Sequence, residues 1–316
     1  AKPPLLSTTR KPGRMAKPPT NPSEIDYQTG LDAAAYLATN RLRSRKTQVR
    51  SAFFLRAGQD APLPPATELL KNRSHHGLHL KLALFYLWAA GSESPDPKHG
   101  DVHTVRGFYD SDVAELFGFP ITDVNGKRRI ANARKRLAGL RPPGQPSLTE
   151  TPKSEEGEVR LLDIEPREGR TPVIRLLKED GSGEKYCPPG APGSGGKYYK
   201  LPVEFWTAGW HLHLSGPAVV ALLVLAHQNE LAKANKPSSP HYKELWVNPT
   251  RRETRFGFSE DTWYKGANEL VDFGLANRIT KVIREPFEDE SRRIRHTYVF
   301  DLENLRVASP PDPASL

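Results

Sequence analysis

Residues 255–275 have the sequence RFGFSEDTWYKGANELVDFGL, and this stretch predicts a tight turn followed by an amphipathic helix. Gly257 can adopt the positive φ that such a turn requires, and Ser259 is a residue type that caps helix N-termini. Glu260 and Asp261 follow, where negative charge favours the first turn of a helix. Apolar residues then recur at helical spacing and predict one buried face, made of Trp263, Ala267, Leu270 and Val271.

Two strands are predicted after this helix. Gly274 is placed to end the helix, because glycine accepts the left-handed backbone found just past many helix C-termini. Residues 276–284 and 292–302 then predict strands, joined by a polar turn at 285–291. The predicted order is therefore helix, turn, helix, strand, turn and strand.

The same order of signals occurs earlier in the chain. Leu116-Phe-Gly-Phe-Pro120 matches the turn at Phe256-Gly-Phe258, and a basic helix is predicted behind it. Two further matches lie upstream, residues 73–91 with 209–228 and residues 51–56 with 197–202. Because four parts match in the same order, we predict two tandem copies of one unit. The first copy carries about six additional residues between its turn and its basic helix.

In the first copy the predicted elements cover most of the unit. They are a strand at 51–56, a core helix at 77–90, a short strand at 103–106, a helix at 110–117, a basic helix at 125–140, hairpin strands at 148–151 and 158–164 with a tip at 153–157, and an extra strand at 171–177. The same unit in the second copy contains the apolar run 217–226, which is about half the length of a membrane span and predicts a core helix.

The predicted fold class is α+β and mainly α, with two tandem domains behind a disordered basic arm. The arm is rich in proline and has five basic residues and no acidic one between Lys2 and Lys17. The expected boundaries are an arm with a short helix near 31–44 (1–45), a first domain (46–178), a linker rich in glycine, serine and proline (179–197), a second domain (198–305) and a flexible tail (306–316).

Overall composition indicates a soluble cytoplasmic protein with a polyanionic partner. The formal net charge is +9 and the sequence pI is about 9.5. The single cysteine excludes an internal disulfide, and neither a membrane span nor a signal peptide is predicted. Translation could begin at Met15, upstream of which the sequence contains no methionine.

The strongest chemical signal is the charge of the first basic helix. Residues 121–141 contain seven basic residues against one acidic residue, Asp123. A buried face of Ile130, Ala133, Leu137 and Leu140 would turn the polar residues outward. Outward arginine and asparagine make bidentate contacts with guanine and adenine, while lysine and flanking arginine hold phosphate. The predicted DNA contacts on this helix are Lys127, Arg128, Arg129, Asn132, Lys135 and Arg136.

The second copy offers fewer contacts. Thr262, Lys265 and Asn268 lie on the outward face of its helix, although Asp261 and Glu269 on or near that face would repel phosphate. Basic residues before the helix and on the last strand would hold the DNA backbone. They are Arg251, Arg252, Arg292 and Arg293.

No catalytic, metal or cofactor site is predicted. His75, His76, His79, His211 and His213 lack cysteine or carboxylate partners at ligand spacing. Cys187 lies in the predicted linker, and the glycine clusters there are not followed by Gly-Lys-Ser/Thr as a phosphate loop requires. The chain therefore carries no enzyme signature.

Phe256-Gly-Phe-Ser-Glu-Asp-Thr-Trp263 and Glu269-Leu-Val-Asp-Phe-Gly-Leu275 resemble the winged helix-turn-helix superfamily. The first copy departs from that pattern, with Pro120 in place of the capping serine. Two such units behind a basic arm resemble plasmid replication initiators and some bacterial transcription regulators. The resemblance implies binding to double-stranded DNA, with each copy contacting part of a site. A partition or chromosome-organising protein that forms a homodimer through residues 31–44, and a protein-interaction scaffold, remain open alternatives.

Overall fold

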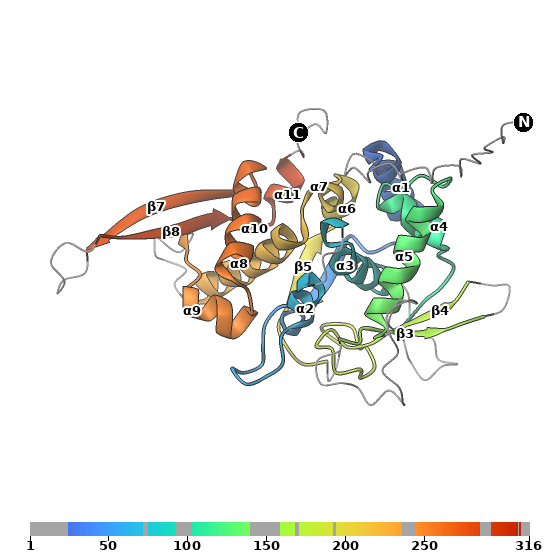
Figure 1. Cartoon of the computed structure of the whole chain (residues 1–316), viewed down its shortest axis with the longest axis horizontal. Coiled ribbons are helices and arrows are strands. Elements are labelled where there is room, and N and C mark those ends of the chain that lie inside the picture. The colour runs from blue at the N-terminus through green and yellow to red at the C-terminus, as the bar shows by residue number, and fades with distance from the viewer. Residues whose placement is uncertain are drawn as a thin grey trace, which may run out of the picture.

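The computed structural model describes residues 25–71, 75–92, 103–139, 159–167, 171–191, 194–235, 244–284, 292–308 and 310. Helices and strands are mixed, with more helix than strand, and the strands form three small antiparallel sheets (Figure 1). Residues 1–24 of the predicted N-terminal arm lie outside the described residues, as do the first-hairpin strand at 148–151 and its tip. Within the described ranges, no helix is both long enough and apolar enough to cross a membrane.

The first half of the chain begins with a helix and then a strand. Its elements are α1 (Tyr27–Asn40), β1 (Lys46–Arg50), α2 (Pro65–Lys71), α3 (Leu78–Ala90), β2 (Thr104–Val105), α4 (Asp110–Leu116), α5 (Val124–Leu137), β3 (Leu162–Glu165) and β4 (Val173–Leu176), with one-turn 3₁₀ helices at Ser51–Phe53 and His75–Gly77. The strand expected at 51–56 is therefore wrong, because strand pairing ends at Arg50 and the chain turns at Ser51.

The second half repeats this order from its first strand onward. Its elements are β5 (Tyr198–Pro202), α6 (Glu204–Thr207), α7 (Trp210–His213), α8 (Gly216–Asn235), β6 (Glu244–Leu245), α9 (Pro249–Arg251), a π-helical turn at Arg252–Phe256, α10 (Glu260–Asp272), β7 (Ala276–Arg284), β8 (Arg292–Phe300) and α11 (Asn304–Val307). The two three-stranded sheets have matching orders, β2-β4-β3 and β6-β8-β7. In both, the last strand of the unit lies in the middle.

The hairpin of the first half differs from the expected one. The strand at 171–177, expected to be extra, is β4 and pairs with β3 from Leu162↔Leu176 to Glu165↔Val173. The strand expected at 158–164 begins only at Leu162. In the second half the predicted strands are confirmed, and β7 pairs with β8 from Ala276↔Phe300 to Arg284↔Arg292.

A β ribbon joins the two halves. β1 and β5 pair antiparallel, so the first strand of one half hydrogen-bonds to the first strand of the other, with Val49 opposite Tyr199. Around this ribbon the indoles of Trp88 and Trp206 stack with ring centroids 5.3 Å apart, and Trp206 Nε1 donates to Thr47 Oγ1 at 3.1 Å. Buried apolar residues of both halves form one continuous core. The halves therefore share packing instead of being independent bodies.

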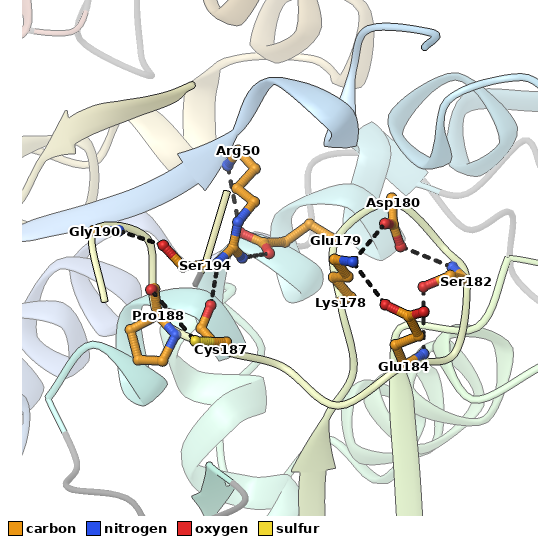
Figure 2. Close-up of polar contacts among 10 residues, drawn as sticks. All are labelled: Arg50, Lys178, Glu179, Asp180, Ser182, Glu184, Cys187, Pro188, Gly190 and Ser194. Carbon is orange, nitrogen blue, oxygen red and sulfur yellow. Dashed lines mark hydrogen bonds and ion pairs between the residues drawn. The ribbon is translucent and has the colours of Figure 1, made fainter. Parts of the chain in front are cut away.

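The segment at 179–197, expected to be a flexible linker, is packed against the first half (Figure 2). Glu179 is buried and forms an ion pair with Arg50 of β1, while the Arg50 guanidinium also donates to the Cys187 carbonyl. Lys178 contacts Asp180 and Glu184 across the following turn. Composition alone suggested flexibility, but one buried carboxylate and its arginine fix the described part of this segment.

The turns before α5 and α10 have the predicted glycine geometry. Gly118 has φ 72° and Gly257 has φ 71°. The Ser259 hydroxyl accepts a hydrogen bond from the Thr262 amide at 3.2 Å and caps α10, as predicted. In the second half the cap, Ser259, follows the turn glycine by two positions, whereas in the first half the cap, Asp123, follows Gly118 by five. The first half therefore carries three additional residues here, and the expected number of about six is wrong.

The predicted helix near 31–44 is present as α1, which begins earlier, at Tyr27. Asp26 caps it, and its carboxylate accepts from the Thr29 amide at 3.1 Å. The buried residues of α1 face α4 and α6 of the same chain, and Ala34 and Leu37 belong to the common core. The buried face of α1 is therefore covered within the chain, so a homodimer through residues 31–44 would have to use the exposed side of the helix.

Candidate nucleic-acid interface

α5 presents a basic surface of a single sign. The helix contains six lysine and arginine residues and no acidic residue. Asp123 lies just before the helix, and its carboxylate accepts a hydrogen bond from the Asn125 amide at 2.8 Å. Ile130, Ala133 and Leu137 are fully buried, as predicted, whereas Leu140 lies outside the described residues. Burial of that face leaves Arg128 and Lys135 exposed on the outer side.

Four other predicted contacts on α5 are half-buried: Lys127, Arg129, Asn132 and Arg136. The Arg129 guanidinium lies 5.2 Å from the centre of the Phe119 ring, which orients it at the side of the helix. Burial and the charge of Arg136 lower the pKa of His79 to about 4. Arg129 and Arg136 are thus flanking groups, and Arg128 and Lys135 form the outermost pair.

Arg134 does not belong to this surface. It is only 6% exposed, its Nε donates to the Tyr86 hydroxyl at 2.8 Å, and its guanidinium forms an ion pair with Asp110. The charge count of residues 121–141 included Arg134, whereas the predicted DNA contacts did not. One of the six is instead a structural link from α5 to α3 and α4.

The predicted contacts on α10 already have partners. Lys265 forms an ion pair with Asp261 one turn earlier at 2.8 Å. Asn268 Oδ1 accepts a hydrogen bond from Arg278 of β7 at 2.7 Å. Thr262 takes part in the capping contact with Ser259, its hydroxyl 2.9 Å from the serine hydroxyl. A ligand must therefore displace or share these contacts.

Glu269 of α10 faces inward, which differs from its expected place on or near the DNA face. Its carboxylate accepts from the Ser215 amide at 2.6 Å and from the Ser215 hydroxyl, at the start of α8. Burial raises the pKa of Glu269, while Ser215 and Lys81 oppose this shift. Glu269 therefore joins α10 to α8 and does not repel phosphate at the surface.

The two arginines before α10 occupy different environments. Arg251 is exposed, as a phosphate contact requires. Arg252 is only 5% exposed, and its guanidinium lies 5.6 Å from the centre of the Tyr264 ring. Arg252 is therefore unsuited to the surface contact predicted for it, because the fold has buried it between the π-helical turn and α10.

The β7–β8 hairpin is the basic element of the second half. Its two strands contain six lysine and arginine residues and no acidic residue. Figure 1 shows this hairpin projecting from one end of the molecule. The predicted contacts Arg292 and Arg293 lie at the start of β8, in register with Arg284 and Ile283. Closer to the body, Lys281 forms an ion pair with Glu244.

Two of the histidines considered as metal ligands, His211 and His213, serve packing. His211 is fully buried, and its Nε2 lies 2.8 Å from the Leu116 carbonyl of the other half. Burial lowers the pKa of His211 to about 3. His213 packs against Tyr27 with ring centroids 4.6 Å apart and the ring planes tilted by 30°. Across the described segments, no cluster of three or more histidine, cysteine or carboxylate side chains is placed to hold a metal ion.

Sequence reasoning did not find a cavity of about 350 Å³ beside α10, which is bounded by α9, the π-helical turn and β8. Arg252 belongs to its lining, together with the half-exposed Trp246 and with His296. No local sequence pattern marks these residues, because they come from separate segments of the chain.

The chain matches no protein-family model, and comparisons with curated proteins and with solved structures gave no significant match.

Proposed function

We propose that the chain is a sequence-specific double-stranded DNA-binding protein with two tandem winged helix-turn-helix units. It acts on nucleoid or plasmid DNA in the cytoplasm, as a transcription regulator or as a plasmid-type replication initiator, without catalysis. The observation that carries the proposal is α5, a helix with one apolar face in the core and an outer surface of one charge. Surface helices ordinarily mix charges of both signs, so a helix without acidic residues favours a polyanion.

The repeated order of elements supports the same proposal. In each half a short helix, a glycine turn and a longer helix precede two antiparallel strands. An α helix fits the major groove of B-DNA, and arginine and asparagine side chains recognise base edges there. Arg128 and Asn132 are the α5 side chains with the chemistry for base contacts, and Lys135 has the chemistry for phosphate.

The second half contributes through its hairpin more than through its helix. The β7–β8 strands supply positive charge, and Arg251 adds an exposed cation beside α10. Contacts of this kind fix position on the duplex backbone, whereas α5 supplies base selection.

Selection of bound duplexes from a random DNA pool by the purified protein, at about 150 mM salt, tests the proposal. We expect an enriched motif with two unequal half-sites. Binding without enrichment would indicate an architectural, partition-type role. The absence of binding would refute DNA recognition.

Salt dependence supplies a second test. With roughly six to ten phosphate contacts, affinity falls about 10³–10⁵-fold between about 50 and 200 mM salt. A complex whose affinity does not change over this range contradicts the electrostatic basis of the proposal.

A protein-docking role for the second half is the alternative that a specific observation favours. α10 has one basic and four acidic residues, and the β7–β8 hairpin exposes a directly paired Val282 and Ile294 at 60% and 64%. A duplex that binds the wild type and a variant with Arg292 and Arg293 replaced by alanine equally well would favour this alternative.

A further inference from the structure

The cavity beside α10 is lined by aromatic, basic, neutral polar and a few aliphatic residues from α9, the π-helical turn, α10, β8 and the segment before α9. It has a volume of about 350 Å³, within the lower range of small-molecule sites. The described lining contains no carboxylate and consists of Trp246, Val247, Asn248, Pro249, Thr250, Arg252, Trp263, Tyr264, Ile294, Arg295, His296 and Tyr298. All full charges in this lining are therefore positive.

Arg252 is a buried cation for which the described residues supply no ion-pair partner. It is 5% exposed, its Nε has no hydrogen-bond partner, and none of the ion pairs among the described residues includes it. A second buried polar group of this lining, the Tyr298 hydroxyl, lies beside the Trp263 indole and makes no hydrogen bond of ordinary geometry, and Tyr298 is 1% exposed. Buried polar groups are normally satisfied, and an unpaired buried charge is costly. The two groups together are the donors that an anion entering the cavity requires.

Aromatic rings form the rest of the wall. Trp246 is 39% exposed, and the Arg295 guanidinium lies 3.9 Å from the centre of its ring. Tyr264 and His296 meet edge to face with ring centroids 6.2 Å apart. Flat side chains of this kind stack on nucleobases, and every base has a face that suits them.

We propose that this cavity binds a nucleoside phosphate, with the phosphate held by Arg252 and the base against Trp246 and Tyr264. Arginine suits the phosphate because its planar fork of N–H groups donates two parallel hydrogen bonds to phosphate oxygens. The nucleotide comes either from free solution or from an unstacked position in a single strand. The site is separate from the α5 surface and needs no duplex.

Calorimetry and tryptophan fluorescence with the full chain test this site, using each nucleoside 5′-monophosphate in turn. Parallel titrations use the nucleoside alone, inorganic phosphate alone and a short single-stranded oligonucleotide. We expect a monophosphate to bind at least about tenfold more tightly than either of its halves, because the cavity offers both stacking and phosphate contacts. Binding of the oligonucleotide without the free nucleotide assigns the source to a strand. Failure of every nucleotide probe overturns the proposal.

Three variants locate the binding. Arg252→Met and Trp246→Ala each weaken binding about tenfold or more, whereas Arg255→Met, an exposed neighbour on the same turn, leaves it within about twofold. Arg252→Met also keeps or raises the melting temperature of the free protein, since it removes an unpaired buried charge. Unchanged binding by Trp246→Ala, or a lowered melting temperature of Arg252→Met, contradicts the site. Because no duplex is present, failure here is distinct from failure of duplex recognition.

Discussion

α5 and α10 occupy the same place in the order of the two halves and have opposite surface chemistry. α5 has six basic and no acidic residues, whereas α10 has one basic and four acidic residues. Both follow a turn glycine of positive φ and both bury an apolar face. The repeated fold therefore fixes where the helix lies and which face it buries. It leaves the outer face free to diverge.

The charges of the two hairpins are distributed the opposite way to those of the two helices, with the basic hairpin in the second half. In the first half Arg175 of β4 pairs with both Asp163 and Glu165 of β3, so the charged residues of the described strands are paired with one another. In the second half the β7–β8 strands contain only basic charges. Each half thus carries one element whose charged residues are all basic, α5 in the first half and the β7–β8 hairpin in the second, although Arg134 and Lys281 within these elements have ion-pair partners. We infer that the first half contacts DNA mainly through its helix and the second mainly through its hairpin.

The largest expected effect separates two neighbours on α5. Arg134→Ala removes a buried guanidinium from Tyr86 and Asp110, so we expect the free energy of unfolding to fall by about 3 kcal/mol. Part of the cost is recovered by hydration, because the Asp110 side chain is 33% exposed. Lys135→Ala, at an exposed position, should change it by less than about 0.5 kcal/mol. Urea denaturation measures the free energy of unfolding of both variants. Equal losses would mean that Arg134 is a surface residue like Lys135.

Next is the contrast in DNA affinity between the two helices. Replacing Arg128 and Lys135 together by alanine should weaken duplex binding about 100-fold, since one base contact and one phosphate contact are lost. Replacing the matched pair, Lys265 and Asn268, by alanine should weaken duplex binding by less than about fivefold, because both side chains already have protein partners. Titration of a labelled duplex at fixed salt measures both losses. Comparable losses for the two pairs would remove the proposed division between the halves.

Local signals allowed the helices and turns of this comparison to be predicted, but not the partners of their side chains. Ser259, Gly257 and Gly274 act on their own backbone, so the sequence around α10 was sufficient. Arg134 meets Tyr86, 48 positions away, and Glu179 meets Arg50 across 129 positions, which no local pattern encodes. The residues on the outer face of α5 were therefore predictable, whereas buried Arg252 and the cavity around it were not.

Acid should weaken the packing that holds the two halves together. His211 of α7 contacts the Leu116 carbonyl at the end of α4, and its shorter contact places the proton on Nε2. Burial lowers its pKa to about 3, so the folded protein disfavours the charged imidazole. The contribution of neutral His211 to the free energy of unfolding is therefore complete above the pKa of the imidazole in the unfolded chain, about 6.5, and is lost as pH falls toward about 3.

From His211 alone we expect the free energy of unfolding to fall by about 2 kcal/mol between about pH 6.5 and 5. His79 and His227, whose pKa values burial lowers to about 4, add to the slope. Urea denaturation across this pH range measures the loss. His211→Gln keeps an N–H donor for the Leu116 carbonyl and should reduce the slope by close to one proton. An unchanged slope in this variant would mean that His211 is not the group that titrates.

The smallest effect tests whether α10 faces the duplex at all. Asp261→Asn removes an exposed acid and releases Lys265, so we expect affinity to rise about threefold at low salt and the gain to shrink as salt is added. Asp272→Asn removes the same charge from the exposed last turn of α10 without releasing a lysine, and should gain less than about twofold. Equal gains from the two variants would mean that only net charge matters. No gain from either would mean that α10 lies away from the duplex and would leave the hairpin and Arg251 as the DNA contacts of the second half, since a helix near phosphate cannot lose an exposed carboxylate without a change in affinity.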